Sequence, residues 1–169
     1  MSDYAIMPFA HPSSILVVCL GNICRSPMAQ AILQAQLAKA GLAIAVDSAG
    51  TARWHEGKPP DRRVLAVACQ RGLDLAGIKA RQLRAADFQR FDLILAMDGD
   101  NLRATEAVRP AGSQTPIRLF LGETTGERAD VPDPFYDGEA AFAALFAALD
   151  AAAKTYVERL RRPADRPVP

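Results

Sequence analysis

Hydrophobic residues follow two alternating patterns along the chain: short continuous apolar runs, and longer stretches in which apolar residues recur at helical spacing. Continuous runs are typical of strands buried on both faces of a parallel sheet. They cover residues 15–20, 44–46, 91–97 and 117–121. The helical stretches cover residues 27–40, 59–72, 101–108 and 138–160. The alternation predicts an α/β fold, a small doubly wound parallel sheet of about four strands with helices on both faces.

The two ends of the chain fall outside this pattern because they are rich in proline and polar residues. We expect an N-terminal extension over residues 1–14, one domain over residues 15–161 and a flexible tail over residues 162–169. Within the domain, residues 122–137 show no clear period and predict a loop of roughly 15 residues, a length that is uncommon and often functional.

Charge and composition exclude several classes of protein. The chain has 169 residues with 20 basic and 19 acidic side chains, so nothing favours binding to nucleic acid or to a membrane surface. No apolar run approaches the length of a membrane span, and the N-terminus lacks the basic start of a signal peptide, which predicts a cytoplasmic protein. Three cysteines and two histidines at unsuitable spacing predict no metal site, and no cofactor is expected.

The first strand and the first helix are joined by a loop whose residues suit a phosphate. Free backbone N–H groups and the positive end of the helix dipole meet there, and the same field lowers the pKa of a thiol such as Cys19 at the strand end. Gly21 permits close backbone approach, and Asn22 tolerates a left-handed conformation. Arg25 offers a planar fork for two phosphoryl oxygens, and Ser26 is expected to cap the helix. The sequence therefore predicts a phosphate-binding loop with a reactive thiol.

Residues 18–27, Val-Cys-Leu-Gly-Asn-Ile-Cys-Arg-Ser-Pro, resemble the signature loop of the low-molecular-weight protein tyrosine phosphatases. The likeness continues, in the family's order, through four later segments. They are Asp47 to Thr51, Ala80 to Gln82, Ala96 to Asp98 with Asn101 and Leu102, and Asp133 to Phe135. The resemblance implies an enzyme that hydrolyses phosphotyrosine in proteins, such as a tyrosine kinase, without a cofactor.

The resemblance also implies a role for each residue of the loop. Cys19 would attack phosphorus and carry a phosphocysteine, and Asp133 would protonate the leaving phenolate and then activate water. Arg25 would bind the phosphoryl oxygens together with the backbone N–H groups of Leu20, Gly21, Asn22, Ile23, Cys24 and Arg25 itself. Ser26 would hydrogen-bond the thiolate, and Asn22 would hold the shape of the loop.

Other residues are open to two interpretations. Trp54, with Phe135 or Tyr136 opposite, would line a deep cleft that selects phosphotyrosine, although a lone tryptophan can instead pack a loop. Cys24 could form a protective disulfide with Cys19 or be a small buried residue. Asp98 could be a carboxylate at the edge of the site, but a helix cap is the favoured interpretation.

One position departs from the family pattern. Ile78 stands where the family often has a histidine that supports Ser26 and Asn22, so this chain must support its loop differently, through water or a main-chain group.

Four alternative functions fit parts of the sequence less well. A protein arginine phosphatase typically has threonine after the loop asparagine, whereas this chain has Ile23. A thiol-dependent arsenate reductase needs further cysteines, and none follows Cys69. A non-catalytic phosphate-binding module would be expected to lose Cys19 or Asp133. A papain-like Cys–His enzyme is disfavoured because neither His11 nor His55 lies in a segment predicted to reach Cys19.

Overall fold

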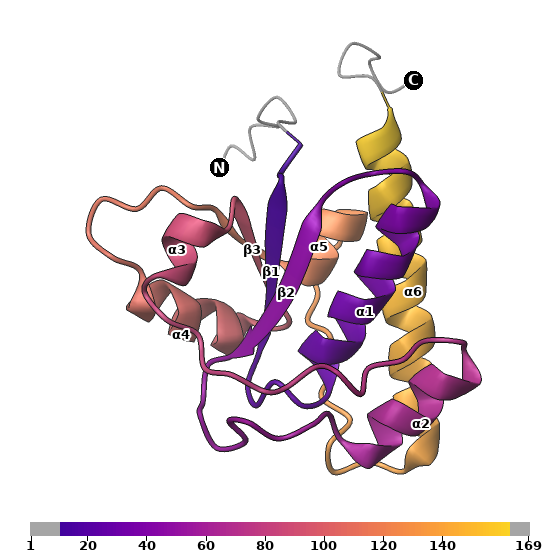
Figure 1. Ribbon diagram of the computed structural model, residues 1–169. Helices are drawn as coiled ribbons and strands as arrows, with labels where there is room; N and C mark the ends of the chain where they lie inside the picture. Colours follow the sequence, from indigo (N-terminus) through magenta and orange to yellow (C-terminus); the bar gives the residue numbers. More distant parts are fainter. Residues whose placement is uncertain (1–10, 163–169) are drawn as a thin grey trace.

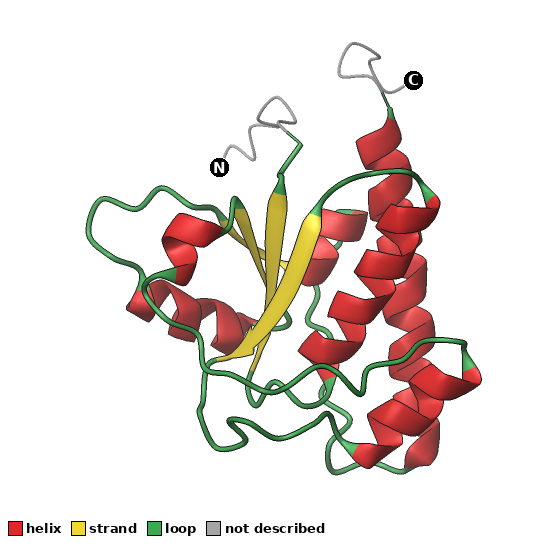
Figure 2. Ribbon diagram, viewed as in Figure 1, coloured by secondary structure: helices red, strands yellow, loops and turns green. Residues whose placement is uncertain are grey.

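A computed structural model describes residues 11–162 of the chain, and its core is one parallel sheet (Figures 1 and 2). The sheet has four strands in the order β2-β1-β3-β4, and every neighbouring pair is parallel. The strands are β1 (Ser14–Cys19), β2 (Ala45–Gly50), β3 (Leu93–Ala96) and β4 (Ile117–Leu119). The predicted fold class is confirmed.

Helices cover both faces of this sheet. They are α1 (Arg25–Lys39), α2 (Arg62–Gln70), α3 (Asp87–Arg90), α4 (Gly99–Val108), α5 (Phe120–Thr125) and α6 (Glu139–Arg161). In Figure 1, α1, α2, α5 and α6 lie on one side of the sheet, and α3 and α4 lie on the other. The central strand β1 supplies both hydrophobic cores, with Ile15 and Val17 facing one and Leu16 and Val18 facing the other. A strand buried on both faces is continuously apolar for this reason.

Several predicted boundaries differ from the structure by a few residues, and packing explains two of them. The run over 117–121 becomes strand only as far as Leu119, because α5 begins at Phe120 and buries Phe120 and Thr124. This short helix also occupies the start of the predicted loop over 122–137. Strand β2 runs on to Gly50, although the part beyond Val46 contains the polar residues Asp47 and Ser48. Hydrophobicity alone misses this part, which pairs with β1 from Leu16 to Cys19.

Helix α6 is long and apolar enough to cross a membrane by length and composition alone, contrary to the expectation from the sequence. Its apolar residues, however, enter the hydrophobic core, where Phe142, Leu149 and Tyr156 are fully buried. It packs against α1, α2 and α5. We therefore read it as a core helix. The proposed extension over 1–14 and tail over 162–169 fall largely outside the described residues.

Candidate active site

The loop between β1 and α1 lies at the carboxyl end of the sheet, where α/β folds place their ligands. Asn22 has a positive φ of 56°, the only non-glycine residue with positive φ among residues 11–162. The N–H groups of residues 21–24 donate to no backbone carbonyl in the described part of the chain. Together with the start of α1, these groups form a site suited to an anion.

The carbonyl groups of the loop are held by neighbouring segments. Cys19 and Leu20 accept hydrogen bonds from the N–H groups of Thr51 and Ala52, both at 2.9 Å, and Ile23 accepts one from Asp61 at 2.8 Å. Gly50 makes this contact possible, because a Cβ atom there would lie 2.8 Å from the Leu20 carbonyl oxygen. The loop is therefore held by the residues that follow β2 and by the residue that precedes α2.

The Cys19 side chain is 3% exposed, and its sulfur lies 3.0 Å from the Ser26 hydroxyl. Ser26 does not cap α1 as expected, since the helix begins at Arg25 and its N-cap residue, Cys24, makes no side-chain cap. Asn22 Nδ2 donates to Ser26 Oγ at 2.8 Å and to Ser48 Oγ at 2.9 Å. A connected group of polar side chains therefore lies behind the thiol.

Arg25 is buried, and its guanidinium is shared between two carboxylates. Its Nη1 donates to Asp98 Oδ2 at 2.7 Å and to the Val131 carbonyl at 2.9 Å, while Nη2 reaches Asp133 Oδ2 at 3.5 Å. Asp98 also caps α4 by accepting from the N–H of Asn101. The favoured interpretation of Asp98 as only a cap is wrong, because one oxygen caps the helix and the other orients Arg25.

Asp133 lies on an exposed loop that makes few hydrogen bonds to the rest of the site. Its side chain is 43% exposed, and Oδ1 accepts from the Phe135 N–H at 3.1 Å. At the base of this loop, the Val131 N–H donates to the Met97 carbonyl at 2.7 Å. Arg63 lies beside the same loop, with its guanidinium carbon 5.5 Å from the centroid of the Phe135 ring. We name residues 131–138 the acid loop.

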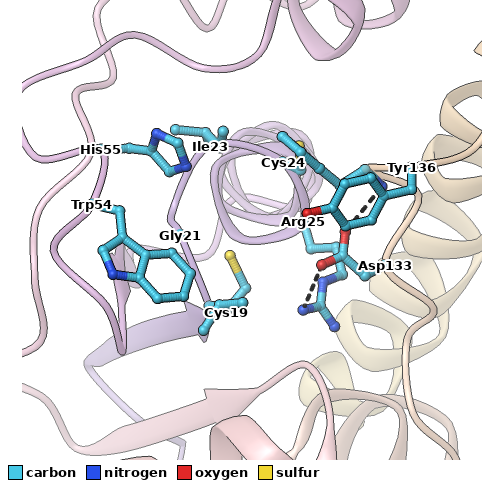
Figure 3. Close-up of a pocket in the computed structure, with 11 residues that line it drawn as sticks. Cys19, Gly21, Ile23, Cys24, Arg25, Trp54, His55, Asp133 and Tyr136 are labelled. Carbon is cyan, nitrogen blue, oxygen red and sulfur yellow. Dashed lines mark hydrogen bonds and ion pairs between the residues drawn. The ribbon is translucent and has the colours of Figure 1, made fainter.

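A pocket opens above Cys19 and is lined by every residue of the loop from Cys19 to Arg25 except Asn22, together with side chains from two further segments. Figure 3 shows Trp54 and Tyr136 on opposite sides of this pocket. Trp54 is 69% exposed and Tyr136 is 96% exposed, so neither packs into the core. Phe135 meets Tyr136 edge to face, with ring centroids 5.0 Å apart.

His55 also lines the pocket, contrary to the expectation that no histidine reaches the region of Cys19. Its ring lies against Gly21, where an added Cβ atom would come within 2.9 Å of His55 Cδ2. It makes no hydrogen bond to Cys19 among the described residues, so it does not form a Cys–His pair. Its position next to Trp54 on the loop over 51–60 was the only signal in the sequence.

The second cysteine of the loop, Cys24, is a buried thiol with a raised pKa. Burial, reinforced by the negative charge of Asp61, raises the pKa of Cys24 from 9.0 to about 12. Cys19, Cys24 and Cys69 are all free thiols. Within residues 11–162, no group of three or more His, Cys, Asp or Glu side chains is placed to hold a metal ion.

Comparison with known proteins places this site in a family. The sequence model of the low molecular weight phosphotyrosine protein phosphatases matches residues 14–166. The chain belongs to this family. Its members are phosphoric monoester hydrolases, so the pocket around Cys19 is a candidate phosphatase site.

Individual phosphatases resemble most of the chain. A low molecular weight phosphotyrosine protein phosphatase from Schizosaccharomyces pombe is 45% identical over 133 residues, covering 76% of this chain and 84% of that protein. A second, from Drosophila melanogaster, is 39% identical and covers 88% and 93% respectively. The crystal structure of a protein tyrosine phosphatase from Entamoeba histolytica, with Hepes in its active site, superposes with a TM-score of 0.80 at 35% identity, covering 87% of this chain and 96% of that one.

Proposed function

We propose that this phosphatase hydrolyses phosphotyrosine in cytoplasmic proteins, such as a tyrosine kinase, through a phosphocysteine on Cys19. The observation that carries the proposal is the convergence of Cys19, Arg25 and Asp133 on one pocket. A nucleophile, an anion-binding fork and a carboxyl group thereby face the same small volume. No metal is needed for this chemistry.

In the first step, the Cys19 thiolate attacks phosphorus and the bond from phosphorus to the tyrosine oxygen breaks. Asp133 gives its proton to the departing phenolate oxygen. Arg25 and the loop N–H groups bind the three remaining phosphoryl oxygens and stabilise the charge of the transition state. Asp98 supports this step because its short ion pair keeps the Arg25 guanidinium at the base of the pocket.

In the second step, water attacks the phosphocysteine and gives a proton to the Asp133 carboxylate. The phosphorus–sulfur bond breaks, inorganic phosphate forms and Cys19 leaves as a thiolate. Ser26 stabilises this leaving group, since its hydroxyl lies 3.0 Å from the sulfur. The active enzyme is then restored.

The preference for phosphotyrosine follows from the walls of the pocket. Trp54 and Tyr136 stand at its mouth, and they would contact both faces of a phenyl ring that reaches down to Cys19. A phosphoserine side chain is too short to fill the same depth. Ile23 also lines the pocket, and its apolar side chain favours a ring over the guanidinium of phosphoarginine.

The test compares peptides carrying phosphotyrosine, phosphoarginine or phosphoserine, together with phenyl phosphate and p-nitrophenyl phosphate, as substrates of the wild type and three variants. Cys19→Ser is expected to lose roughly 10⁴-fold or more in kcat/KM, as losing a nucleophile does. Asp133→Ala is expected to lose about 10²-fold with phenyl phosphate and less with p-nitrophenyl phosphate, whose leaving group needs no proton. Asp137→Ala removes another exposed carboxylate of the acid loop and should match the wild type.

Each arm can contradict the proposal. Hydrolysis that survives Cys19→Ser would exclude the phosphocysteine. Equal losses with both aryl phosphates would remove Asp133 as the acid. Phosphoarginine as the best substrate would overturn the specificity argument from Ile23 and favour the arginine phosphatase alternative. A chelator should leave the wild-type rate unchanged.

A further inference from the structure

Gln30 lies on α1, four residues after Ser26, and does not line the pocket. Its side chain is nevertheless 8% exposed, and its Oε1 accepts a hydrogen bond of 2.6 Å from Ser48 Oγ on β2. Ser48 is itself bonded to Asn22 of the phosphate-binding loop. Gln30 is therefore the last member of a chain of hydrogen bonds that begins at the sulfur of Cys19.

The direction of these bonds is set at Asn22. The backbone N–H of Arg81 donates to Asn22 Oδ1 at 3.0 Å. Because a backbone N–H can only donate, this bond fixes which end of the amide is oxygen, and the Nδ2 group faces the two serines. One Nδ2 proton goes to Ser26 Oγ and the other to Ser48 Oγ.

Each serine hydroxyl has a single proton, and its oxygen already accepts from Asn22. Ser26 can therefore direct its proton to the Cys19 sulfur, which is the arrangement that favours a thiolate. Ser48 must direct its proton away from Asn22, and Gln30 Oε1 receives it. Without that acceptor, the buried Ser48 proton would have no partner, and a rotation of the hydroxyl to find one would disturb the bond that Ser48 accepts from Asn22.

We propose that Gln30 is a positioning residue for the Cys19 nucleophile and acts through Ser48, Asn22 and Ser26. The inference rests on the proposed function in one respect, that Cys19 is the nucleophile. It assigns to Gln30 part of the support that the sequence left open at Ile78, and the main-chain N–H of Arg81 supplies another part. That isoleucine packs against the hydrophobic core and offers no polar group to the loop.

Burial makes the arrangement sensitive to the loss of one member. Asn22, Ser26 and Ser48 are 1%, 0% and 2% exposed, so water cannot readily replace a missing partner. Hydrogen bonds in such surroundings polarise one another, and a buried polar group left without a partner is costly. A change at Gln30 should consequently alter the reactivity of the Cys19 sulfur, although three side chains lie between them.

Gln34 supplies a matched control on the same helix. Its Nε2 donates to the Val46 carbonyl at 2.9 Å, so it too ties α1 to β2, but it has no bond to the loop network. Gln30→Met is expected to lower kcat/KM about fivefold and to raise the midpoint pH of Cys19 alkylation by iodoacetate by about 0.5 unit. Gln34→Met should leave both quantities at the wild-type value. Thermal unfolding of the two variants shows whether either has lost stability, so that an effect on Cys19 can be separated from general destabilisation.

A second pair of variants tests the route. If Gln30 acts through Ser48, then adding Gln30→Met to Ser48→Ala should shift the alkylation midpoint no further. Equal shifts in Gln30→Met and Gln34→Met, or a full additional shift in the Ser48→Ala background, would overturn the proposal. Fragment mass spectrometry locates the alkyl group on Cys19. This readout needs no hydrolysis, so failure here and failure of the proposed function are separate results.

Discussion

Most residues of the phosphate-binding loop over 19–26 are buried, whereas most residues of the acid loop over 131–138 are exposed. The first loop has its carbonyls bound by three neighbouring N–H groups and its side chains bound behind the thiol. The second reaches the site through the 3.5 Å contact of Asp133 with Arg25 and through the bonds of Val131. An anion site needs fixed dipoles, while the acid proposed for both chemical steps needs access to a phenolate and to a water.

Among the variants that test this comparison, Arg25→Lys should give the largest effect, because it changes the group that both loops share. Lysine keeps the charge but cannot bond Asp98, Val131 and a phosphoryl oxygen in one plane. We expect kcat/KM for p-nitrophenyl phosphate to fall about 10²- to 10³-fold. Arg103→Lys, an exposed arginine on α4, serves as the control. A loss below about fivefold would mean that a point charge suffices at this position.

Gly50→Ala tests whether the phosphate-binding loop depends on close contact with β2. The new methyl group would crowd the Leu20 carbonyl oxygen and the Asn22 nitrogen, at 2.8 and 3.1 Å. Urea unfolding should show a loss of about 1–3 kcal/mol, and activity should fall with it. Gly77→Ala has no atom within 4 Å of the new methyl group and should change stability by less than about 0.5 kcal/mol. Equal stability of the two variants would show that the phosphate-binding loop can shift to accommodate the methyl group without loss of stability.

Arg63→Met tests how the acid loop is held. The guanidinium carbon lies 4.3 Å from the centroid of Phe142 on α6 and 5.5 Å from that of Phe135 on the acid loop, and Asp61 binds the same guanidinium through both oxygens. Without this stack, kcat/KM should fall about fivefold for phenyl phosphate and less for p-nitrophenyl phosphate. Arg62→Met, one residue earlier and exposed, should have no effect. Identical losses for both substrates would point to a cause other than Asp133.

Cys24→Ala gives the smallest expected change. It tests whether burial in the phosphate-binding loop raises the pKa of the Cys24 thiol. The pKa of Cys24 is raised to about 12 in the folded protein, so the neutral thiol favours folding. Its contribution is complete below the ordinary value of 9.0 and is lost as the pH rises towards 12. Urea unfolding of both proteins at about pH 8 and about pH 10.5 should show a smaller decline in stability for the variant. Equal declines in the stability of the variant and the wild type would contradict the raised pKa of Cys24.

Much of the fold and the centre of the site could be predicted because their signals are local in sequence. The apolar run that becomes β1 leads directly to Cys19, and Arg25 follows six residues later in the same loop. The partners of these residues could not be predicted in the same way. Asp98 is 73 residues from Arg25, and its role depends on how β3 places the start of α4 beside the loop.

Some misses reflect tertiary contacts that override a local pattern. Serine is a common helix-capping residue, but the Ser26 hydroxyl is bound to the Cys19 sulfur and to the Asn22 amide instead. Gln30 looks like an ordinary polar residue of α1 until β2 brings Ser48 against it. Helix α5 forms where the sequence suggested the end of a strand, because Phe120 and Thr124 are buried there.

The placement of Trp54 and Tyr136 has a consequence for how this enzyme can diverge. Both side chains stand on surface loops, are largely exposed and contribute nothing to the two hydrophobic cores. Replacing them therefore costs little stability, whereas the residues beneath them are fixed by many mutual contacts. Selection can exchange the rim of the pocket, and with it the phosphoprotein that docks there, while the hydrolytic centre stays the same.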